Sequence, residues 1–393
     1  MALPTSGQLS LDQMHVEAGG DTGTTCSIND ADIRAMIDKA DGATSSFQDF
    51  YGASSSTYVA ASGGTTTTSG NYKYHYFNSS GTLTFSSIGS GGPSNVVDYI
   101  IIAGGGSGGK GYWNYSTQYI NFSGGGGGAG GYKTGTFNAV AQSYTITVGG
   151  GGSSVSAGSY TNLTNDGSDS SISGVHTSSG GGGGGYLHYY YSNQSYAALG
   201  GQVKGRSGGS GGGNMLMHFG SGITEDGVLN TNANMDVGGS GVSGEGNAGS
   251  KGVRTGGYNA GHSGSGGGKG GVPPSATGNM YAPESYSQTT YKQDGGPGSN
   301  TGDANYNSAQ RGGGGGGSIW AWYANQSTSL YSEGGAGGGG RGAKSRNGQG
   351  GGNYTSAQSG TANTGGGGGG GIYQNASGAG GSGIVMIRYQ YQG

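Results

Sequence analysis

The sequence predicts a mostly irregular and β-structured protein, in which long loops join the helices of a polyglycine-II bundle. Three observations predict this class. Glycine supplies 102 of the 393 residues, and much of it is concentrated in blocks. Apolar runs typical of β-strands stand before, between and after the blocks. Aromatic residues make up 10% of the chain and charged residues 9%, whereas disordered chains are typically rich in charge and poor in aromatics.

Residues 1–52 have an ordinary composition and predict a small N-terminal module. Cap-type residues at 27–30 precede apolar residues at helical spacing, so one short helix is expected near residues 30–40, after an extended segment at residues 8–11. So short a segment is too small to hold a core alone, and its apolar side chains are expected to anchor it to a partner. The candidate anchor residues are Leu9, Leu11, Ile33, Met36, Ile37, Phe47, Phe50 and Tyr51.

Residues 53–70 predict a polar linker, and residues 71–393 predict one glycine-rich domain. The domain is expected to begin with a β-hairpin, because residues 72–77 alternate, residues 78–81 are typical of a turn, and residues 82–85 resume the strand pattern. Further strands are expected at residues 96–102, 143–148 and 383–389.

A run such as residues 365–371 has no side chain to bury, so any order in it must come from backbone packed against backbone. Polyproline-II geometry repeats every three residues without internal hydrogen bonds, which leaves each N–H and C=O free to pair with a neighbouring helix. A flexible linker is the alternative interpretation of each block. The blocks lie at residues 104–109, 124–131, 149–152, 180–185, 208–213, 264–271, 312–317, 334–340 and 365–371.

Two sets of segments resemble bacteriophage proteins. Residues 2–11, 29–34 and 47–52 are similar to the N-terminal segment of many phage tail and fibre proteins. Residues 97–106, 124–135, 144–149 and 381–389 resemble the glycine-rich domain of phage tail fibres, especially those of marine and cyanobacterial phages. The resemblance implies a virion fibre, commonly trimeric, whose loops between polyglycine-II helices determine receptor specificity, as in the tip adhesins of T-even-type phages.

Tyrosine-rich inserts between the blocks are the candidate receptor-binding loops. Tyrosine among Ser, Gly and Asn is typical of adaptable binding loops, and sugar rings stack on aromatic faces, so a host surface glycan is the expected ligand. The alternative is that the rings only cover the lattice as local cores. The candidate residues are Tyr112, Trp113, Tyr115, Tyr119, Tyr186, His188, Tyr189, Tyr190, Tyr191, Tyr196, Tyr281, Tyr286, Tyr291, Trp320, Trp322, Tyr323 and Tyr331.

Other function classes receive little support from the sequence. The net charge of −3 and the scattered basic residues argue against nucleic acid as a partner, and no apolar run of membrane-spanning length or signal peptide is expected. Residues 104–109 match a dinucleotide fingerprint but lack the helix that must follow it. The six histidines lack metal-ligand spacing, and paired catalytic acids are missing. We therefore expect no enzyme activity, cofactor or metal.

The sequence thus favours an exposed phage fibre protein located in the virion. Residues 1–52 are expected to bind other tail or virion proteins, and the tyrosine-rich loops a host glycan or protein. A purely structural fibre, decoration or filament subunit is the main alternative, and an ice-binding protein with flat threonine faces is a third.

Overall fold

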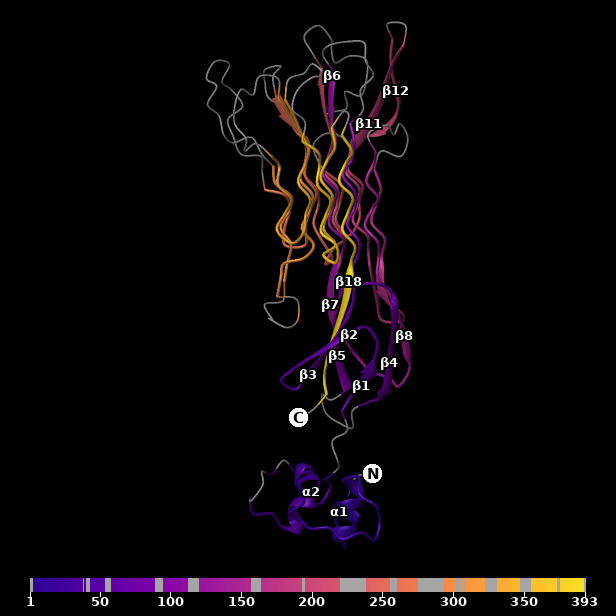
Figure 1. Cartoon of the computed structure of the whole chain (residues 1–393), viewed down its shortest axis with the longest axis vertical. Coiled ribbons are helices and arrows are strands. Elements are labelled where there is room, and N and C mark those ends of the chain that lie inside the picture. Colours follow the sequence, from indigo (N-terminus) through magenta and orange to yellow (C-terminus); the bar gives the residue numbers. More distant parts are fainter. Residues whose placement is uncertain are drawn as a thin grey trace.

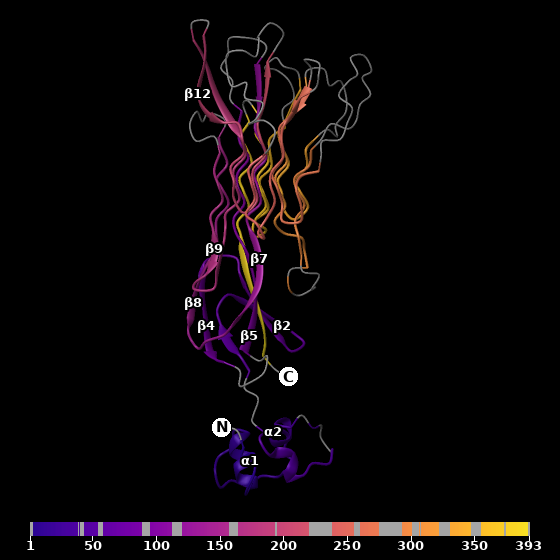
Figure 2. The ribbon, with the colours of Figure 1, turned by 180° about the vertical axis from the view of Figure 1, so that it is seen from behind.

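The computed structural model describes residues 3–37, 39, 43–53, 58–88, 95–111, 120–156, 164–192, 195–219, 238–254, 260–274, 293–300, 306, 308–321, 331–346, 355–372 and 375–391. The described chain has three parts (Figures 1 and 2): a small helical module at the N-terminus, a β-sandwich, and a long bundle of side-by-side backbone segments. This agrees with the predicted class, since the protein is mostly β and irregular and its helices are short.

The N-terminal module contains α1 (Leu11–Glu17), α2 (Ala31–Ala35) and the 3-10 helix η1 (Phe47–Phe50). The expected helix is therefore confirmed in α2, although it is shorter than predicted. The extended conformation expected through Leu11 is wrong, because α1 begins there. Its start is fixed by a capping box, in which Ser10 Oγ accepts a hydrogen bond from the Gln13 N–H (3.1 Å) and Gln13 Oε1 accepts one from the Ser10 N–H (2.8 Å).

The module also buries a core of its own, contrary to the expectation that it could not. Leu3, Met14, Ile33 and Phe50 are buried together. Leu9, Leu11, Met36 and Ile37 pack partly against this cluster. The segment wraps around its own apolar side chains, so most of the candidate anchor residues stabilise the module from within.

The sandwich consists of two antiparallel five-stranded sheets. One sheet has the order β1 (Ala60–Ser62), β4 (Gly81–Ser87), β8 (Ser143–Thr147), β9 (Ser170–Ile172), β10 (His176–Ser178). The other has the order β2 (Thr65–Ser69), β3 (Tyr72–Phe77), β18 (Ile384–Gln390), β5 (Val96–Ile102), β7 (Tyr132–Asn138). The C-terminal strand β18 thus lies at the centre of its sheet, between β3 and β5.

The predicted strands are confirmed as β3, β4, β5, β8 and β18, but the predicted hairpin is wrong. β3 pairs with β2 and β18, whereas β4 pairs with β1 and β8 in the other sheet. The segment 78–80 therefore crosses from one sheet to the other, because both strands direct aromatic or aliphatic side chains into the core between the sheets. Part of the expected linker is also structured: residues 60–62 and 65–69 form β1 and β2.

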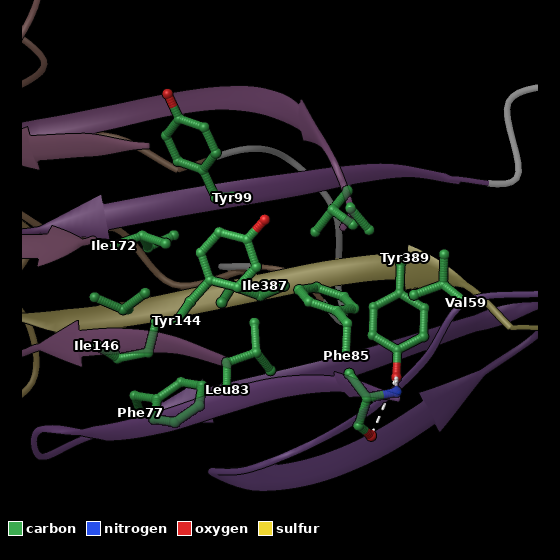
Figure 3. Close-up of a cluster of buried hydrophobic side chains, with 14 of the residues drawn as sticks. Val59, Phe77, Leu83, Phe85, Tyr99, Tyr144, Ile146, Ile172, Ile387 and Tyr389 are labelled. Atoms are coloured by element: carbon green, nitrogen blue, oxygen red, sulfur yellow. Dashed lines mark hydrogen bonds between the residues drawn. The ribbon is translucent and has the colours of Figure 1, made fainter. Parts of the chain in front are cut away.

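The core between the sheets contains large apolar side chains from nearly every strand (Figure 3). Phe85 makes an edge-on contact with Tyr144, and Leu83, Ile146 and Ile101 are fully buried. A polar group is satisfied inside this core. The Tyr389 hydroxyl lies 3.1 Å from Nε2 of the buried His75 and accepts a hydrogen bond from the Ala61 N–H at 3.0 Å.

Beyond the sandwich, the chain forms a lattice of backbone segments, here called rods. The rod at residues 103–110 shows the pattern. The N–H groups of Gly104 and Ser107 donate to residues 168 and 165, those of Gly105 and Gly108 to residues 381 and 378, and those of Gly106 and Gly109 to residues 128 and 125. Residues three apart thus bond to the same neighbour, which is the three-residue repeat expected of polyglycine II.

The rod at residues 124–131 is enclosed by six neighbours. Its N–H groups donate to rods at residues 365–371, 179–185 and 264–267, while its carbonyl groups accept from rods at residues 106–109, 210–213 and 315–318. Six neighbours around one rod is hexagonal packing, in which each of the three faces donates to one neighbour and accepts from another. The predicted polyglycine-II bundle is confirmed.

Only glycine fits at most interior positions. A Cβ added to Gly127 would lie 2.2 Å from the carbonyl oxygen of Gly106, and one added to Gly367 would lie 2.0 Å from that of Gly127. Rods this close have no room for side chains, so backbone hydrogen bonds and van der Waals contact replace side-chain burial.

Acidic side chains complete the hydrogen bonding at one edge of the lattice. Asp166 and Asp169, three residues apart on one outer rod, accept hydrogen bonds from the N–H groups of Gly183 and Gly180, which are also three apart (2.8 Å each). Asp166 also pairs with Arg206 at 3.1 Å. At this edge the two carboxylates accept the hydrogen bonds that the carbonyl groups of a neighbouring rod accept inside the lattice.

Candidate functional site at the far end of the lattice

The lattice has one end at the sandwich and one far from it. The rods that continue β5 and precede β7 meet next to the sandwich, where the Ala103 N–H donates to the Gly131 carbonyl at 2.9 Å. At the other end, Gly109 donates to Gly125, Gly124 to Gly371, and Gly125 to Gly185. The residues that follow these bonds therefore form the far end.

Short strands extend the rods at the far end (Figure 1). β6 (Ile120–Ser123) pairs with β13 (Leu216–Phe219), and β11 (Tyr186–Ser192) pairs with β12 (Ser195–Gln202) in a protruding hairpin. A four-stranded sheet has the order β14 (Val253–Arg254), β15 (Ala260–His262), β16 (Ile319–Ala321), β17 (Lys344–Arg346). The chain thus changes from polyglycine-II rods to β-strands as glycine gives way to larger residues.

The tyrosine-rich inserts are attached to this end. Gly111 and β6 flank residues 112–119, β11 and β12 carry residues 186–202, and β16 ends where residues 322–330 begin. Gln293 Nε2 donates to the Pro274 carbonyl at 3.3 Å, so the two ends of the insert at residues 275–292 also lie together. The described ends of all four inserts therefore meet at the far end.

The structure describes only some of the candidate residues. Lying outside the described residues are Tyr112, Trp113, Tyr115, Tyr119, Tyr281, Tyr286, Tyr291, Trp322 and Tyr323. His188, Tyr189, Tyr190, Tyr191 and Tyr196 lie in the β11–β12 hairpin, where Tyr191 is opposite Tyr196, and Trp320 lies in β16 opposite Gly261. Tyr186 is half-buried at the start of β11. These described candidates therefore lie on strands of the far end.

Tyr331 is the candidate whose surroundings are described most fully. The Arg341 guanidinium lies 4.2 Å from the centroid of its ring, and Lys344 Nζ lies 5.1 Å from it. Both are cation–π contacts, which hold the ring in one position. Tyr331 thus acts partly as a support for neighbouring basic side chains, a role that the sequence did not predict.

Buried basic residues lie beneath the far end and were missed from the sequence. Lys110 is fully buried; its Nζ donates to the Ser156 carbonyl at 2.9 Å, and burial lowers its pKa to about 8. His262 and Lys344 are almost completely buried, and burial also lowers the pKa of His262. The only sequence signal for Lys110 is its place directly after a glycine block, where the rod's close packing continues.

The candidate anchor residues lie in the N-terminal module. Ile33 and Phe50 are fully buried, and the Tyr51 hydroxyl donates to the Gly7 carbonyl. Phe47 is 44% exposed, and so is available to a partner together with Val16 at 43%. The module therefore exposes these two apolar side chains outside its own core.

No metal or membrane feature marks the described part of the chain. Within it, no three His, Cys, Asp or Glu side chains are grouped closely enough to hold a metal ion. Nor does any of its helices have the length and apolar character needed to cross a membrane.

Comparison with known proteins identifies the family of the chain. The family described as a glycine-rich domain matches residues 78–329, which is more than half of the sequence. The chain therefore belongs to this family. The match begins just before β4 and covers six of the ten strands of the sandwich and the greater part of the lattice. A search of curated proteins gives no match.

Proposed function

We propose that this chain is a virion fibre protein of a bacteriophage, which attaches to the particle through residues 1–52 and binds a host surface receptor through its far-end inserts. The observation that carries the proposal is the position of the inserts. Four tyrosine-rich segments, widely separated in the sequence, begin and end at the same end of the lattice. Residues gathered in this way can form one binding surface.

The lattice itself supports the proposal, because its inner rods are closed to a ligand. Its inner rods are enclosed on all faces, and their N–H and C=O groups are already paired. The lattice also holds the described ends of the inserts in fixed relative positions, and such preorganisation lowers the entropy lost when a ligand binds. Tyrosine rings beside Asn and Ser suit the stacking faces and hydroxyl groups of a glycan.

The proposal is tested by binding of the purified, fluorescently labelled full chain to bacteria that support growth of a phage encoding it. We expect saturable binding, and inhibition of phage adsorption by antiserum against the chain. Variants Tyr189→Ser and Trp322→Ser should each weaken cell binding by roughly tenfold, because an aromatic contact of this kind contributes about 1–2 kcal/mol.

The matched control is Val272→Ser. Val272 is 58% exposed and follows the turn at Lys269, whose Nζ lies 5.7 Å from the Tyr132 ring at the sandwich end of the lattice. This change should leave cell binding unaltered. If the folded chain binds no susceptible bacteria and its antiserum leaves adsorption unchanged, the receptor-binding proposal is wrong. A loss of particle assembly in the loop variants, with adsorption of the remaining particles intact, would indicate a structural fibre instead.

A further inference from the structure

The sandwich has four edge strands, and three of them carry features that prevent further pairing. β1 is three residues long and has a register shift between Ala60 and Ala61. β10 is also three residues long, and its His176 faces Glu245 at 3.7 Å. β7 carries Lys133, and the N–H of its first residue, Tyr132, donates to the Glu245 carbonyl at 3.0 Å. An edge strand is usually kept from pairing with another chain by its short length, an irregular register, a charged side chain, or a segment that covers it.

The fourth edge, β2, has none of these protections. It is five residues long and pairs with β3 in unbroken register. Thr65, Thr66, Thr67 and Thr68 are all exposed, and the strand contains no charged residue or proline. Among the described residues, no backbone hydrogen bond other than those of the β3 ladder reaches these four threonines. β2 is therefore an open edge of high β-propensity.

The turn that follows β2 identifies which of its backbone groups face outward. Gly70 and Asn71 form a two-residue connection, with Gly70 at a φ of 54° and Ser69 opposite Tyr72. The residues that close such a turn are hydrogen-bonded to each other, and pairing alternates from there along an antiparallel ladder. Thr67 and Thr65 therefore bond to β3, while Thr66 and Thr68 direct their N–H and C=O groups away from the sheet.

We propose that β2 pairs with β2 of a second copy of this chain, in antiparallel orientation about a two-fold axis through Thr67. Thr66 then lies opposite Thr68 of the partner subunit, and each such pair exchanges two hydrogen bonds. The two five-stranded sheets become one continuous sheet across the interface. This two-fold self-association is independent of the proposed receptor binding, and it differs from the trimer that the resemblance to tail fibres implies.

The sequence of the strand favours a second copy as the occupant. Under a two-fold axis through Thr67, threonine meets threonine at the three central positions, and Thr65 meets Ser69 of the partner subunit at each end. Cross-strand Thr–Thr pairs are favourable, and no like charges oppose each other. Pairing of β2 with β7 of a second copy is less suitable, because the first N–H of β7, that of Tyr132, already donates to the Glu245 carbonyl.

Disulfide trapping tests this arrangement directly. Thr67 would face Thr67 of the partner subunit at a non-hydrogen-bonded position, where Cα atoms lie about 4.5 Å apart, within disulfide range. Thr67→Cys in a Cys26→Ser background should therefore give mainly a covalent dimer under mild oxidation. The matched control, Thr136→Cys in the same background, places the thiol on β7 and should remain monomeric.

Sedimentation of the full chain gives the second test. Thr68→Pro removes an outward N–H from each β2, so the dimer loses two hydrogen bonds across the interface. The association constant of the dimer should therefore fall by roughly tenfold or more. The unfolding transition should stay close to wild type, because the ladder to β3 is kept. A wild-type chain that remains monomeric, an oligomer unaffected by Thr68→Pro, or equal cross-linking of the two cysteine variants would each overturn the proposal.

Discussion

The sandwich and the lattice both bury their backbone with its N–H and C=O groups hydrogen-bonded, but they fill their interiors in opposite ways. In the sandwich, backbone groups pair within two sheets and large side chains such as Phe85 and Leu83 fill the space between them. In the lattice, backbone groups pair in every direction around a rod, and the side chain is removed so that the rods can touch. The sandwich should therefore tolerate changes of side-chain size better than the inner rods of the lattice, where an added Cβ meets a carbonyl oxygen of a neighbouring rod.

The sharpest way to test this comparison is to add one methyl group to an inner rod. In Gly127→Ala the new Cβ would lie 2.2 Å from the Gly106 carbonyl oxygen, so neighbouring rods must separate and lose hydrogen bonds. We expect a loss of about 4 kcal/mol or more in the free energy of unfolding, measured by urea denaturation.

Gly150→Ala is the control for this change. Nothing lies within 4 Å of a Cβ at this position, on an outer rod. It should be neutral or stabilise the protein by up to about 1 kcal/mol, because alanine restricts the unfolded chain. Equal effects of the two substitutions would contradict the close-packed lattice.

In the sandwich the corresponding change removes atoms. Leu83 is fully buried, so Leu83→Ala should leave a cavity and lower the free energy of unfolding by about 3 kcal/mol. Val140→Ala, at a position that is 53% exposed, should cost much less. If Leu83→Ala instead destabilises the protein more than Gly127→Ala, the predicted difference in tolerance between the two regions is wrong.

The buried charge in the lattice should make stability depend on pH. The pKa of Lys110 falls to about 8 on folding, below its usual 10.5. The unfolded chain then binds more protons between these values, so the free energy of unfolding should rise with pH from 8 to 10.5, by up to about 1.4 kcal/mol per pH unit. Lys110→Met should flatten this rise in thermal unfolding curves. An unchanged slope in the variant would show that another group causes it.

The smallest expected effect concerns the edge of the lattice. Asp166→Ala removes the acceptor for the Gly183 N–H and the partner of Arg206, and should lower the free energy of unfolding by about 1 kcal/mol. Asp166→Asn keeps an oxygen acceptor and should recover most of this loss. Hydrogen exchange of the Gly183 amide checks the mechanism, since exchange should accelerate in the alanine variant alone.

The rods of the lattice could be predicted only where close backbone packing requires glycine at nearly every position. The glycine blocks at residues 124–131, broken only by Ala129, and at residues 365–371 were expected to form rods, and both are inner rods with little room for side chains. Outer rods such as residues 164–169 were missed. One residue in three can face outward there and carry a side chain, so the glycine pattern is diluted by Asp166 and Asp169.

Two other predictions from the sequence were wrong: the β3–β4 hairpin and the extended conformation through Leu11. The strand patterns of β3 and β4 were correct, but the two strands do not pair, because local alternation does not show in which sheet a strand lies. The start of α1 was readable in principle from Ser10 and Gln13, which form its capping box. The shared location of the tyrosine-rich inserts followed from the bundle hypothesis, whereas the support of Tyr331 by Arg341 and Lys344 did not.

The sequence by itself determined that any order in the glycine blocks must come from backbone pairing and that apolar runs frame the blocks, because these are properties of single segments. Only the tertiary structure decided which rods are enclosed, which strands share a sheet, and which edge is left open at β2. The physical reason is that a backbone group has the same hydrogen-bonding capacity in every residue except proline. Which partner it finds is set by the whole fold and leaves no trace in the local sequence.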